Sequence, residues 1–349
     1  MRIVVNDIAA SKGGAMTVLR DFYNTVKEND CENEWIFLLG DKYLEETENI
    51  KIITLPQIKS STIKRLLFDL FAGKKFIKKL SPNVVFSMQN TVTFGLRVPQ
   101  VIYMHQSIPF QDIKKFSFFK RSERNLAVVQ HLLGAIIRAS VRRADKVIVQ
   151  SEWIRDAVIE KCRVDKSKVV NILPPMKDIS EYIDSSVFDK TSFFYPTANM
   201  IYKNNDVVYA ASQILDKKEI EHTVTLTLPE AKSRGSVKCV GRLPYEEVLK
   251  TYNTSTLIFS SYIETVGFPM FEARAIGSIV LASDCPFSRE VLKGYDKAFF
   301  FNPFDAEELA ELMKKVISGE ISKKDISTVS AEIYNSWKAV MNEVVSLSI

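Results

Sequence analysis

Two glutamates separated by seven residues form the part of the chain whose residue types are best suited to chemistry. Glu264 and Glu272 bracket the string Thr-Val-Gly-Phe-Pro-Met-Phe, which follows an apolar run at 257–261. Gly267 in this string lets the backbone approach a ligand closely. Free amides at a helix N-terminus favour a diphosphate, and carboxylates accept hydrogen bonds from several hydroxyl groups. A nucleotide sugar combines both groups, although two surface glutamates flanking a helix cap would show the same spacing.

Four positions elsewhere have residue types that suit the same ligand. Lys203 follows the first predicted strand of the second half, where a lysine would neutralise a leaving diphosphate. Arg242 follows another predicted strand and would stack on a base or contact phosphate. For both residues the alternative is a solvated surface side chain. Gly13 and Gly14 lie in the first strand-to-helix loop, where a glycine pair lets amides approach a phosphate or sugar, or simply forms a turn; without G-x-G-x-x-G, a dinucleotide is not expected.

One of the three histidines is placed for function. His105 ends a predicted strand, and ligands of parallel sheets bind where the strands end. His131 in an apolar helix and His222 in a charged turn are interpreted as structural. The sequence shows no Ser/His/Asp set, P-loop or metal-ligand cluster, so we expect neither a metal nor another cofactor. The four cysteines are scattered without a C-x-x-C pair, which is typical of reduced thiols in a cytoplasmic protein.

The elements that position these residues alternate between short strands and amphipathic helices, twice along the chain. In the first half, strands are predicted at 2–5, 35–39, 50–55, 84–87, 100–104 and 146–150, with helices from 16, over 122–144 and from 151. In the second half, strands are predicted at 193–195, 223–228, 237–240, 256–260 and 279–282, with helices at 205–215, 246–252, from 272, at 306–317 and at 330–344. This order predicts two α/β domains with parallel sheets and a site in the cleft between them.

Composition agrees with two folded domains. The chain has 349 residues, of which 46% are hydrophobic and 26% charged, so disordered and fibrous classes are excluded. The first residues lack the form of a signal peptide, and no apolar run is long enough to span a bilayer. The net charge of +5 is modest but uneven: seven basic residues and one acid lie in 59–79, and nine basic residues and three acids lie in 111–146.

The glutamate segment resembles the signature of glycosyltransferase family 4. The resemblance rests on Glu264 and Glu272 at their spacing, on Gly267-Phe268-Pro269 and on Glu272-Ala273; it covers most of the chain and is sharp in the C-terminal half. It implies the GT-B fold, which is α/β with two Rossmann-like domains and a cleft between them, and a retaining enzyme. It also implies that Glu264 contacts donor-sugar hydroxyls, that Glu272 binds the ribose, and that the backbone around Gly267 and Phe268 meets the phosphates.

Other positions extend the resemblance. Lys203 resembles a lysine that the family has after the first strand of its nucleotide domain, and Arg242 resembles a residue of the loop beside the base. His105 resembles a histidine near the sugar, and the Gly13-Gly14 loop resembles a loop that faces the donor. The family usually has an arginine a few residues before this lysine, whereas here Ala198 lies in a Tyr-Pro-Thr-Ala string. Enzymes of this family do not depend on a metal held by Asp-x-Asp.

The resemblance predicts the domain organisation and the activity. We expect an acceptor-binding domain at 1–175, a linker at 176–191, a nucleotide-sugar-binding domain at 192–330, and a last helix within 331–349 that returns to the N-terminal domain and docks through Trp337. The enzyme would be a hexosyl- or deoxyhexosyltransferase that moves a sugar from a nucleotide-diphosphate sugar to a hydroxyl of a lipid-linked acceptor, in capsule or O-antigen biosynthesis. A sugar-nucleotide epimerase of the same fold and a non-catalytic nucleotide-sugar-binding subunit remain alternatives.

The two basic stretches have three interpretations. They are solvated faces covering a core, or a nucleic-acid surface, for which no motif is present, or a surface that binds anionic lipid. Because many relatives use lipid-linked acceptors, we expect a cytoplasmic protein that is peripheral on the inner face of the cell membrane and binds no nucleic acid. In this interpretation the cations Lys114, Lys115, Lys120, Arg121 and Arg124 meet headgroups, and Phe116, Phe118 and Phe119 insert.

Overall fold

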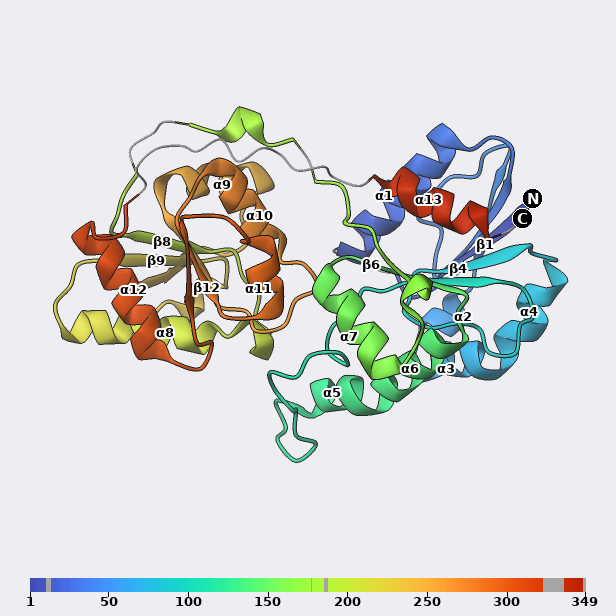
Figure 1. Ribbon diagram of the computed structural model, residues 1–349, viewed down its shortest axis with the longest axis horizontal. Helices are drawn as coiled ribbons and strands as arrows, with labels where there is room; N and C mark the ends of the chain where they lie inside the picture. Colours follow the sequence, from blue (N-terminus) through green and yellow to red (C-terminus); the bar gives the residue numbers. More distant parts are fainter. Residues whose placement is uncertain (11–13, 177, 185–187, 323–335, 348–349) are drawn as a thin grey trace. The chain divides into compact units, whose positions relative to one another are not determined.

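The computed structural model describes residues 1–10, 14–176, 178–184, 188–322 and 336–347 (Figure 1). The chain divides into two compact units. The first comprises Met1–Pro175 together with Tyr334–Ile349, and the second comprises Met176–Ile333. Each unit has its own parallel sheet with helices packed on it, so the prediction of two α/β domains is confirmed.

The sheet of the first unit has seven parallel strands in the order β3-β2-β1-β4-β5-β6-β7. They are β1 (Arg2–Asp7), β2 (Glu34–Leu39), β3 (Ile50–Thr54), β4 (Val84–Ser87), β5 (Gln100–Tyr103), β6 (Lys146–Val149) and β7 (Val169–Asn171). The central strands are buried almost throughout because helices cover both faces of a parallel sheet. The strand order reverses beside β1: Val4 pairs with Ile36 of β2 on one side and with Val85 of β4 on the other.

The helices of the first unit include two π-helical segments. The elements are α1 (Gly14–Asn29), α2 (Pro56–Lys59), α3 (Thr62–Leu67), η1 (Phe68–Ala72), α4 (Gly73–Lys79), α5 (Arg124–Ala127), η2 (Val128–Leu133), α6 (Gly134–Arg143), α7 (Glu152–Cys162), the short 3₁₀ turn η3 (Lys166–Lys168) and α13 (Trp337–Ser346). The π segments are η1 and η2. The helix predicted over 122–144 is therefore a run of α5, η2 and α6 rather than one regular α-helix.

The last helix completes the core of the first unit. α13 packs beside α1, and the Trp337 ring lies 6.1 Å from Phe22 and 5.3 Å from Tyr103, centroid to centroid. Trp337, Val340, Met341 and Val344 are buried in the same cluster as β1 and β2. The predicted start of this helix at 330 falls outside the described residues.

The sheet of the second unit has six parallel strands in the order β10-β9-β8-β11-β12-β13. They are β8 (Ser192–Tyr195), β9 (Thr223–Leu226), β10 (Val237–Cys239), β11 (Thr256–Phe259), β12 (Val280–Ser283) and β13 (Ala298–Phe301). The helical elements are η4 (Ser180–Tyr182), η5 (Ile201–Lys203), α8 (Asn205–Lys217), η6 (Glu230–Lys232), α9 (Tyr245–Thr254), α10 (Phe268–Ile276), α11 (Pro286–Val291) and α12 (Ala306–Ser318). The strand order reverses between β8 and β11.

The segment predicted as the linker is attached to the second unit where the structure describes it. η4 contacts α9 and α10. The Asn253 side chain holds it there, since its amide donates to the Tyr182 carbonyl at 2.6 Å and its oxygen accepts from the Asp184 amide at 3.0 Å.

Candidate functional site

Lys203 and Glu264 lie where the strand order of the second sheet reverses. β8 and β11 are neighbouring parallel strands, so their carboxyl ends lie at the same edge of the sheet. The loop after β8 leads to Lys203, and the loop after β11 contains Glu264. Ligands of open α/β sheets bind at such a reversal.

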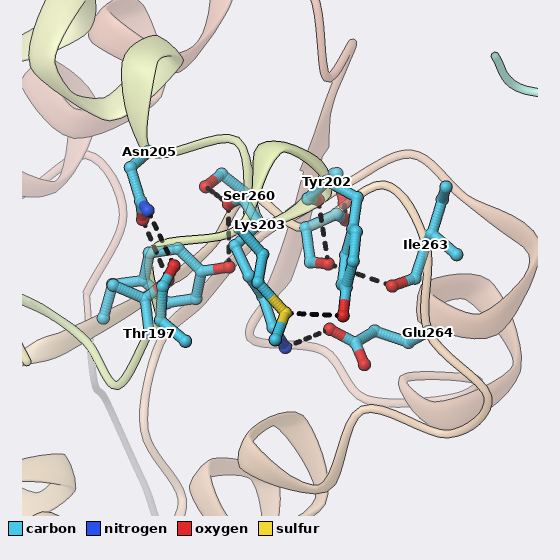
Figure 2. A network of polar contacts seen from close by, with 12 residues as sticks. Thr197, Tyr202, Lys203, Asn205, Ser260, Ile263 and Glu264 are labelled. Atoms are coloured by element: carbon cyan, nitrogen blue, oxygen red, sulfur yellow. Dashed lines mark hydrogen bonds and ion pairs between the residues drawn. The ribbon is translucent and has the colours of Figure 1, made fainter. Parts of the chain in front are cut away.

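The two side chains form an ion pair between Lys203 Nζ and Glu264 Oε1 (Figure 2). Their side chains are 20% and 18% exposed. The ammonium group also lies 5.9 Å from the centre of the Phe259 ring. Lys203 is therefore half-buried and paired rather than a solvated surface lysine, and both charges can still be reached by a ligand.

Hydrogen bonds between the two loops fix the backbone at Lys203. Its carbonyl accepts from the hydroxyls of Tyr195 and Ser260, each at 3.0 Å. The Tyr202 carbonyl accepts from the Ser261 hydroxyl at 3.1 Å. These two serines were not predicted as site residues, although hydroxyl residues directly after an apolar strand were the available signal.

The next residues anchor the same loop from its other end. Asn204 adopts a left-handed backbone with φ 56°, which asparagine tolerates better than most residues. The Asn205 side chain accepts from the Thr197 hydroxyl at 2.8 Å and donates to the Ala198 carbonyl at 2.9 Å (Figure 2). Ala198 thus brings a methyl group and a bonded carbonyl to the region where relatives usually have an arginine.

The turn at Gly267 prepares the N-terminus of α10. Gly267 has φ 88°, a left-handed backbone conformation that favours glycine; a Cβ atom there would also lie 2.6 Å from Met270 Cε, so the end of that side chain would have to move. The first turn of α10 has neither an acidic residue nor a side-chain cap among the described residues. Pro269 has no N–H group, and the Met270 amide donates to the Gly267 carbonyl at 3.0 Å, so the backbone amide of half-exposed Phe268 is the group that these first three residues offer to an anion.

Glu272 lies in α10 beneath two tyrosines of α9. It is only 8% exposed, and Tyr245 donates to Oε1 at 2.9 Å while Tyr252 donates to Oε2 at 3.2 Å. Burial raises the pKa of Glu272, and the two tyrosine hydrogen bonds oppose that rise. Tyr245 is 43% exposed whereas Tyr252 is fully buried. Oε1, the oxygen that accepts from Tyr245, is therefore the one bonded to a side chain at the surface. The seven-residue spacing of the tyrosines, which places both on one helix face, could have revealed them.

Arg242 lies in the loop before α9. Gly241 beside it has φ 74°, and its amide donates to the Leu228 carbonyl at 2.8 Å. The Arg242 side chain is exposed and has no hydrogen bond or ion pair with the described part of the chain. The structure does not pair it with Lys203, Glu264 or Glu272.

The remaining predicted residues belong to the first unit. Gly13 lies outside the described residues, and Gly14 is the exposed first residue of α1. The His105 Nδ1 accepts from the Gln150 amide at 3.1 Å, and the ring also bonds the Met88 carbonyl. Burial lowers the pKa of His105 to about 4, so the ring is neutral at pH 7 with both nitrogens engaged.

His222, in the second unit, is held by hydrogen bonds within the protein. Its ring nitrogens bond to the Ser212 hydroxyl at 2.7 Å and to the Ile220 carbonyl at 2.8 Å.

The described residues contain no cluster of three or more His, Cys, Asp or Glu side chains that could hold a metal ion. No helix within them has the length and apolarity needed to cross a membrane.

The basic segment after β5 differs from its prediction at Phe116. This ring is 3% exposed, and its amide donates to Gln130 Oε1 at 2.8 Å. Glu123 pairs with Lys114 at 3.2 Å and with Lys120 at 3.8 Å, so the cations beside the buried ring are neutralised. The prediction that Phe116 inserts into lipid is therefore wrong. Phe118 is partly exposed, and Phe119 is 94% exposed.

Family models match both units of the chain. The model described as Glycosyltransferase Family 4 matches residues 12–176, and the model described as Glycosyl transferases group 1 matches residues 202–332. A curated relative, the O-antigen chain mannosyltransferase RfbU of Salmonella typhimurium (strain LT2), is 22% identical over 280 residues, which is 76% of each chain.

Solved structures of glycosyltransferases share the fold. WaaG, a glycosyltransferase involved in lipopolysaccharide biosynthesis, superposes with a TM-score of 0.70 at 12% identity, covering 98% of this chain and 99% of its own. Anabaena Alr3699/HepE in complex with UDP-glucose superposes with a TM-score of 0.64 at 14% identity, covering 99% of this chain and 98% of its own. The two family models and the two parallel sheets together show that this chain belongs to glycosyltransferase family 4 and is a glycosyltransferase with the GT-B fold.

Proposed function

We propose that the protein transfers a sugar, with retention of anomeric configuration, from a nucleotide-diphosphate sugar to a hydroxyl of a lipid-linked saccharide during assembly of a surface polysaccharide such as O-antigen or capsule. The observation that carries the proposal is the Lys203–Glu264 ion pair beside the uncapped N-terminus of α10, at the strand reversal of the second sheet. The relative named as an O-antigen chain mannosyltransferase and the similar structure holding UDP-glucose support it.

The pair can exchange partners when the donor binds. Both side chains are still partly exposed, and the donor offers each charge a new partner, so the two charges need not be left unpaired when they separate. Lys203 would then bind the diphosphate, whose negative charge grows as the glycosidic bond breaks, together with the backbone at Gly267 and Phe268. Glu264 would accept hydrogen bonds from hydroxyls of the donor sugar.

The remaining roles follow from the surroundings of each residue. Glu272 would accept a ribose hydroxyl at Oε1, and the exposed Arg242 would contact the base or a phosphate. His105 is neutral at pH 7 and both of its ring nitrogens are bonded within the protein, so it would exchange one of these partners to hydrogen-bond the sugar rather than transfer a proton. In the same-face attack that gives retention, the leaving phosphate takes the acceptor proton, so no residue is assigned as a nucleophile. The helix amides and Lys203 would balance the diphosphate without a metal.

The exposed aromatic loop supports a membrane location for this function. Phe119 and Phe118 project from the segment that also has exposed Lys115, Arg121 and Arg124. Rings flanked by cations are favourable at an anionic surface, where each cation contributes about 1 kcal/mol. We propose that the protein is peripheral on the cytoplasmic face of the membrane, where a lipid-linked acceptor is present.

Product analysis with a panel of nucleotide sugars tests the proposal. The protein is incubated with each donor and a membrane lipid extract, and the nucleotide and lipid fractions are analysed separately. Release of nucleoside diphosphate with labelled sugar in the lipid fraction is expected, and NMR of the product should show the anomeric configuration of the donor. The rate should not change with EDTA. An isomerised nucleotide sugar would indicate an epimerase, and binding without turnover would indicate a binding subunit.

A further inference from the structure

A cavity of about 170 Å³ in the first unit lies at the carboxyl edge of its sheet. Ala9 after β1, Gln89 and Asn90 after β4, and Gln106 after β5 contribute to its lining. The strand order reverses between β1 and β4, which is the position where open α/β sheets bind ligands. The cavity is smaller than pockets for drug-sized molecules, which have about 300–1,000 Å³. It therefore suits a single ring.

The cavity has one polar wall and one apolar wall. Gln89, Asn90 and the carboxyl group of Asp69 form the polar wall. Aliphatic side chains form the other: Leu66, Val129, Leu133, Ile136 and Ile137. A pyranose ring has the matching surface, because its C–H groups form an apolar face and its hydroxyls form a hydrogen-bonding rim.

Asp69 is a buried carboxyl group at the centre of the polar wall. Thr91 donates to Oδ2 at 2.6 Å, whereas the amides of Gln89 and Asn6 approach only to 3.2–3.4 Å. Burial raises the pKa of Asp69 to about 7, against these hydrogen bonds. The Gln89 amide also lies 3.3 Å from Oδ1, so the carboxyl group accepts from three side chains, and only the Thr91 bond is short. A ligand hydroxyl would therefore compete with the long amide bonds. A buried carboxyl group whose pKa is perturbed in a cavity marks a site candidate.

Two further oxygens beside Asp69 lack donors. Asn6 Oδ1 and Gln89 Oε1 are buried, and neither has a hydrogen-bond partner among the described residues. Both belong to the amides that donate to Asp69. Gln89 lines the cavity whereas Asn6 does not, so the polar wall includes one acceptor without a donor, which favours a ligand with hydroxyl groups. Arg65 does not create an anion site here, because its guanidinium donates to the Lys59 carbonyl and the Thr62 hydroxyl.

Both π-helical segments contribute to this cavity. η1 supplies Asp69, and η2 supplies Val129 and Leu133. π-helical turns are rare and occur frequently at functional sites. Two such segments facing one cavity are independent support for a binding role.

We infer that this cavity binds a pyranose ring of the acceptor saccharide, with the Asp69 carboxyl group and the Gln89 amide receiving its hydroxyls and Leu133 and Ile136 packing on its C–H face. The inference rests on the proposed transfer to a saccharide acceptor and adds where that saccharide lies within the first unit. Asp69 and Leu133 are then residues that contact the acceptor, and they play no part in donor binding.

Saturation-transfer NMR on the full chain tests the inference with methyl α- and β-pyranosides of glucose, galactose and mannose as probes. At least one glycoside should receive saturation, mainly at ring C–H protons, while cyclohexanol should bind less well because it lacks the hydroxyl rim. Leu133→Trp fills the cavity and should abolish the signal. Leu132→Trp is the matched control, because Leu132 is adjacent on η2 but 59% exposed, and it should retain the signal.

A second variant changes the chemistry of the cavity and keeps its shape. Asp69→Asn should weaken glycoside binding about tenfold at pH 8, where the wild-type carboxyl group, with its pKa of about 7, is mostly ionised. The inference is overturned if no glycoside receives saturation, if Leu133→Trp binds as the wild type does, or if cyclohexanol binds as well as the glycosides and Asp69→Asn has no effect.

Donor turnover separates this inference from the proposed function. Leu133→Trp should still hydrolyse the nucleotide sugar slowly but should lose transfer to the lipid acceptor. If the variant transfers sugar at the wild-type rate, the function stands and the cavity assignment is wrong. If the wild type binds glycosides through Leu133 but neither binds nor turns over any nucleotide sugar, the sugar cavity stands and the proposed function is wrong.

Discussion

Glu272→Gln should weaken nucleotide binding by about ten- to a hundredfold. The glutamine is preferred to alanine because alanine would leave the buried Tyr252 hydroxyl without an acceptor. A glutamine has only one carbonyl oxygen. This oxygen should face Tyr252, whose hydroxyl has no access to water. The NH₂ group of the glutamine would then occupy the position of Oε1, where the hydroxyls of Tyr245 and of the ribose both need an acceptor.

The expected magnitude follows from this geometry. A hydrogen bond to a charged group contributes about 1.5–3 kcal/mol, and every 1.4 kcal/mol is a factor of about ten in the dissociation constant. Because the ribose loses its acceptor rather than exchanging a charged for a neutral one, the whole contribution should be lost.

Isothermal titration with UDP, GDP and ADP measures the effect on the nucleotide that the wild type binds best. Glu247→Gln is the matched control, since Glu247 is an exposed glutamate of α9 and its replacement causes the same change in charge. The control should bind within about twofold of the wild type. Wild-type affinity should also fall as the pH is lowered towards the raised pKa of Glu272, whereas Glu272→Gln should lose this dependence. Equal affinities of Glu272→Gln and wild type at pH 8 would refute the ribose assignment.

Three further predictions concern turnover, stability and the membrane. Lys203→Ala should lower kcat about a hundredfold with a much smaller change in KM, because charge on the diphosphate grows in the transition state; steady-state kinetics would instead show an unchanged kcat if the lysine only pairs with Glu264. Burial raises the pKa of Asp7 to about 8 from 3.8, so the folded state holds a proton that the unfolded state releases. The free energy of unfolding should therefore fall as the pH rises from about 4 to 8, by at most about 1.4 kcal/mol per pH unit, and urea titrations of Asp7→Asn should lack this component. The protein should sediment with anionic but not neutral liposomes at low salt, and Phe119→Ser combined with Arg121→Gln should release it while Lys314→Gln does not; a wild type that stays in the supernatant contradicts the membrane proposal.

Long periodic elements and strand-to-helix alternation were predictable from sequence because they depend on local patterns. β4 was predicted at its observed bounds, and β1, β2 and β8 within two residues. β7 and β13 were missed; both are short, and their pairing with β6 and β12 depends on strands elsewhere in the chain. The helices over 56–79, which include η1, were not predicted. η2 was missed as a π segment because Val128–Leu133 has the composition of an ordinary helix.

The site was predictable in its residue types and less so in its contacts. Glu264, Glu272 and Gly267 lie in one continuous segment, so their spacing was visible. The pairing of Glu264 with Lys203 joins positions 61 apart and depends on two strands lying side by side. Phe116 was misjudged for a similar reason: its burial depends on Gln130 and Glu123, which the local run of cations and rings does not reveal.

The placement of α13 has a consequence for how the protein is made. Trp337 packs against Phe22 and Tyr103, so the first unit lacks part of its core until the ribosome has translated α13. Domains usually fold in the order of synthesis, N-terminal first. Here the second unit, whose described elements end with α12, is complete in sequence before the first. The newly made first unit therefore exposes an apolar groove along α1 throughout synthesis of the second, and a nascent chain stalled before Trp337 should be a substrate for chaperones.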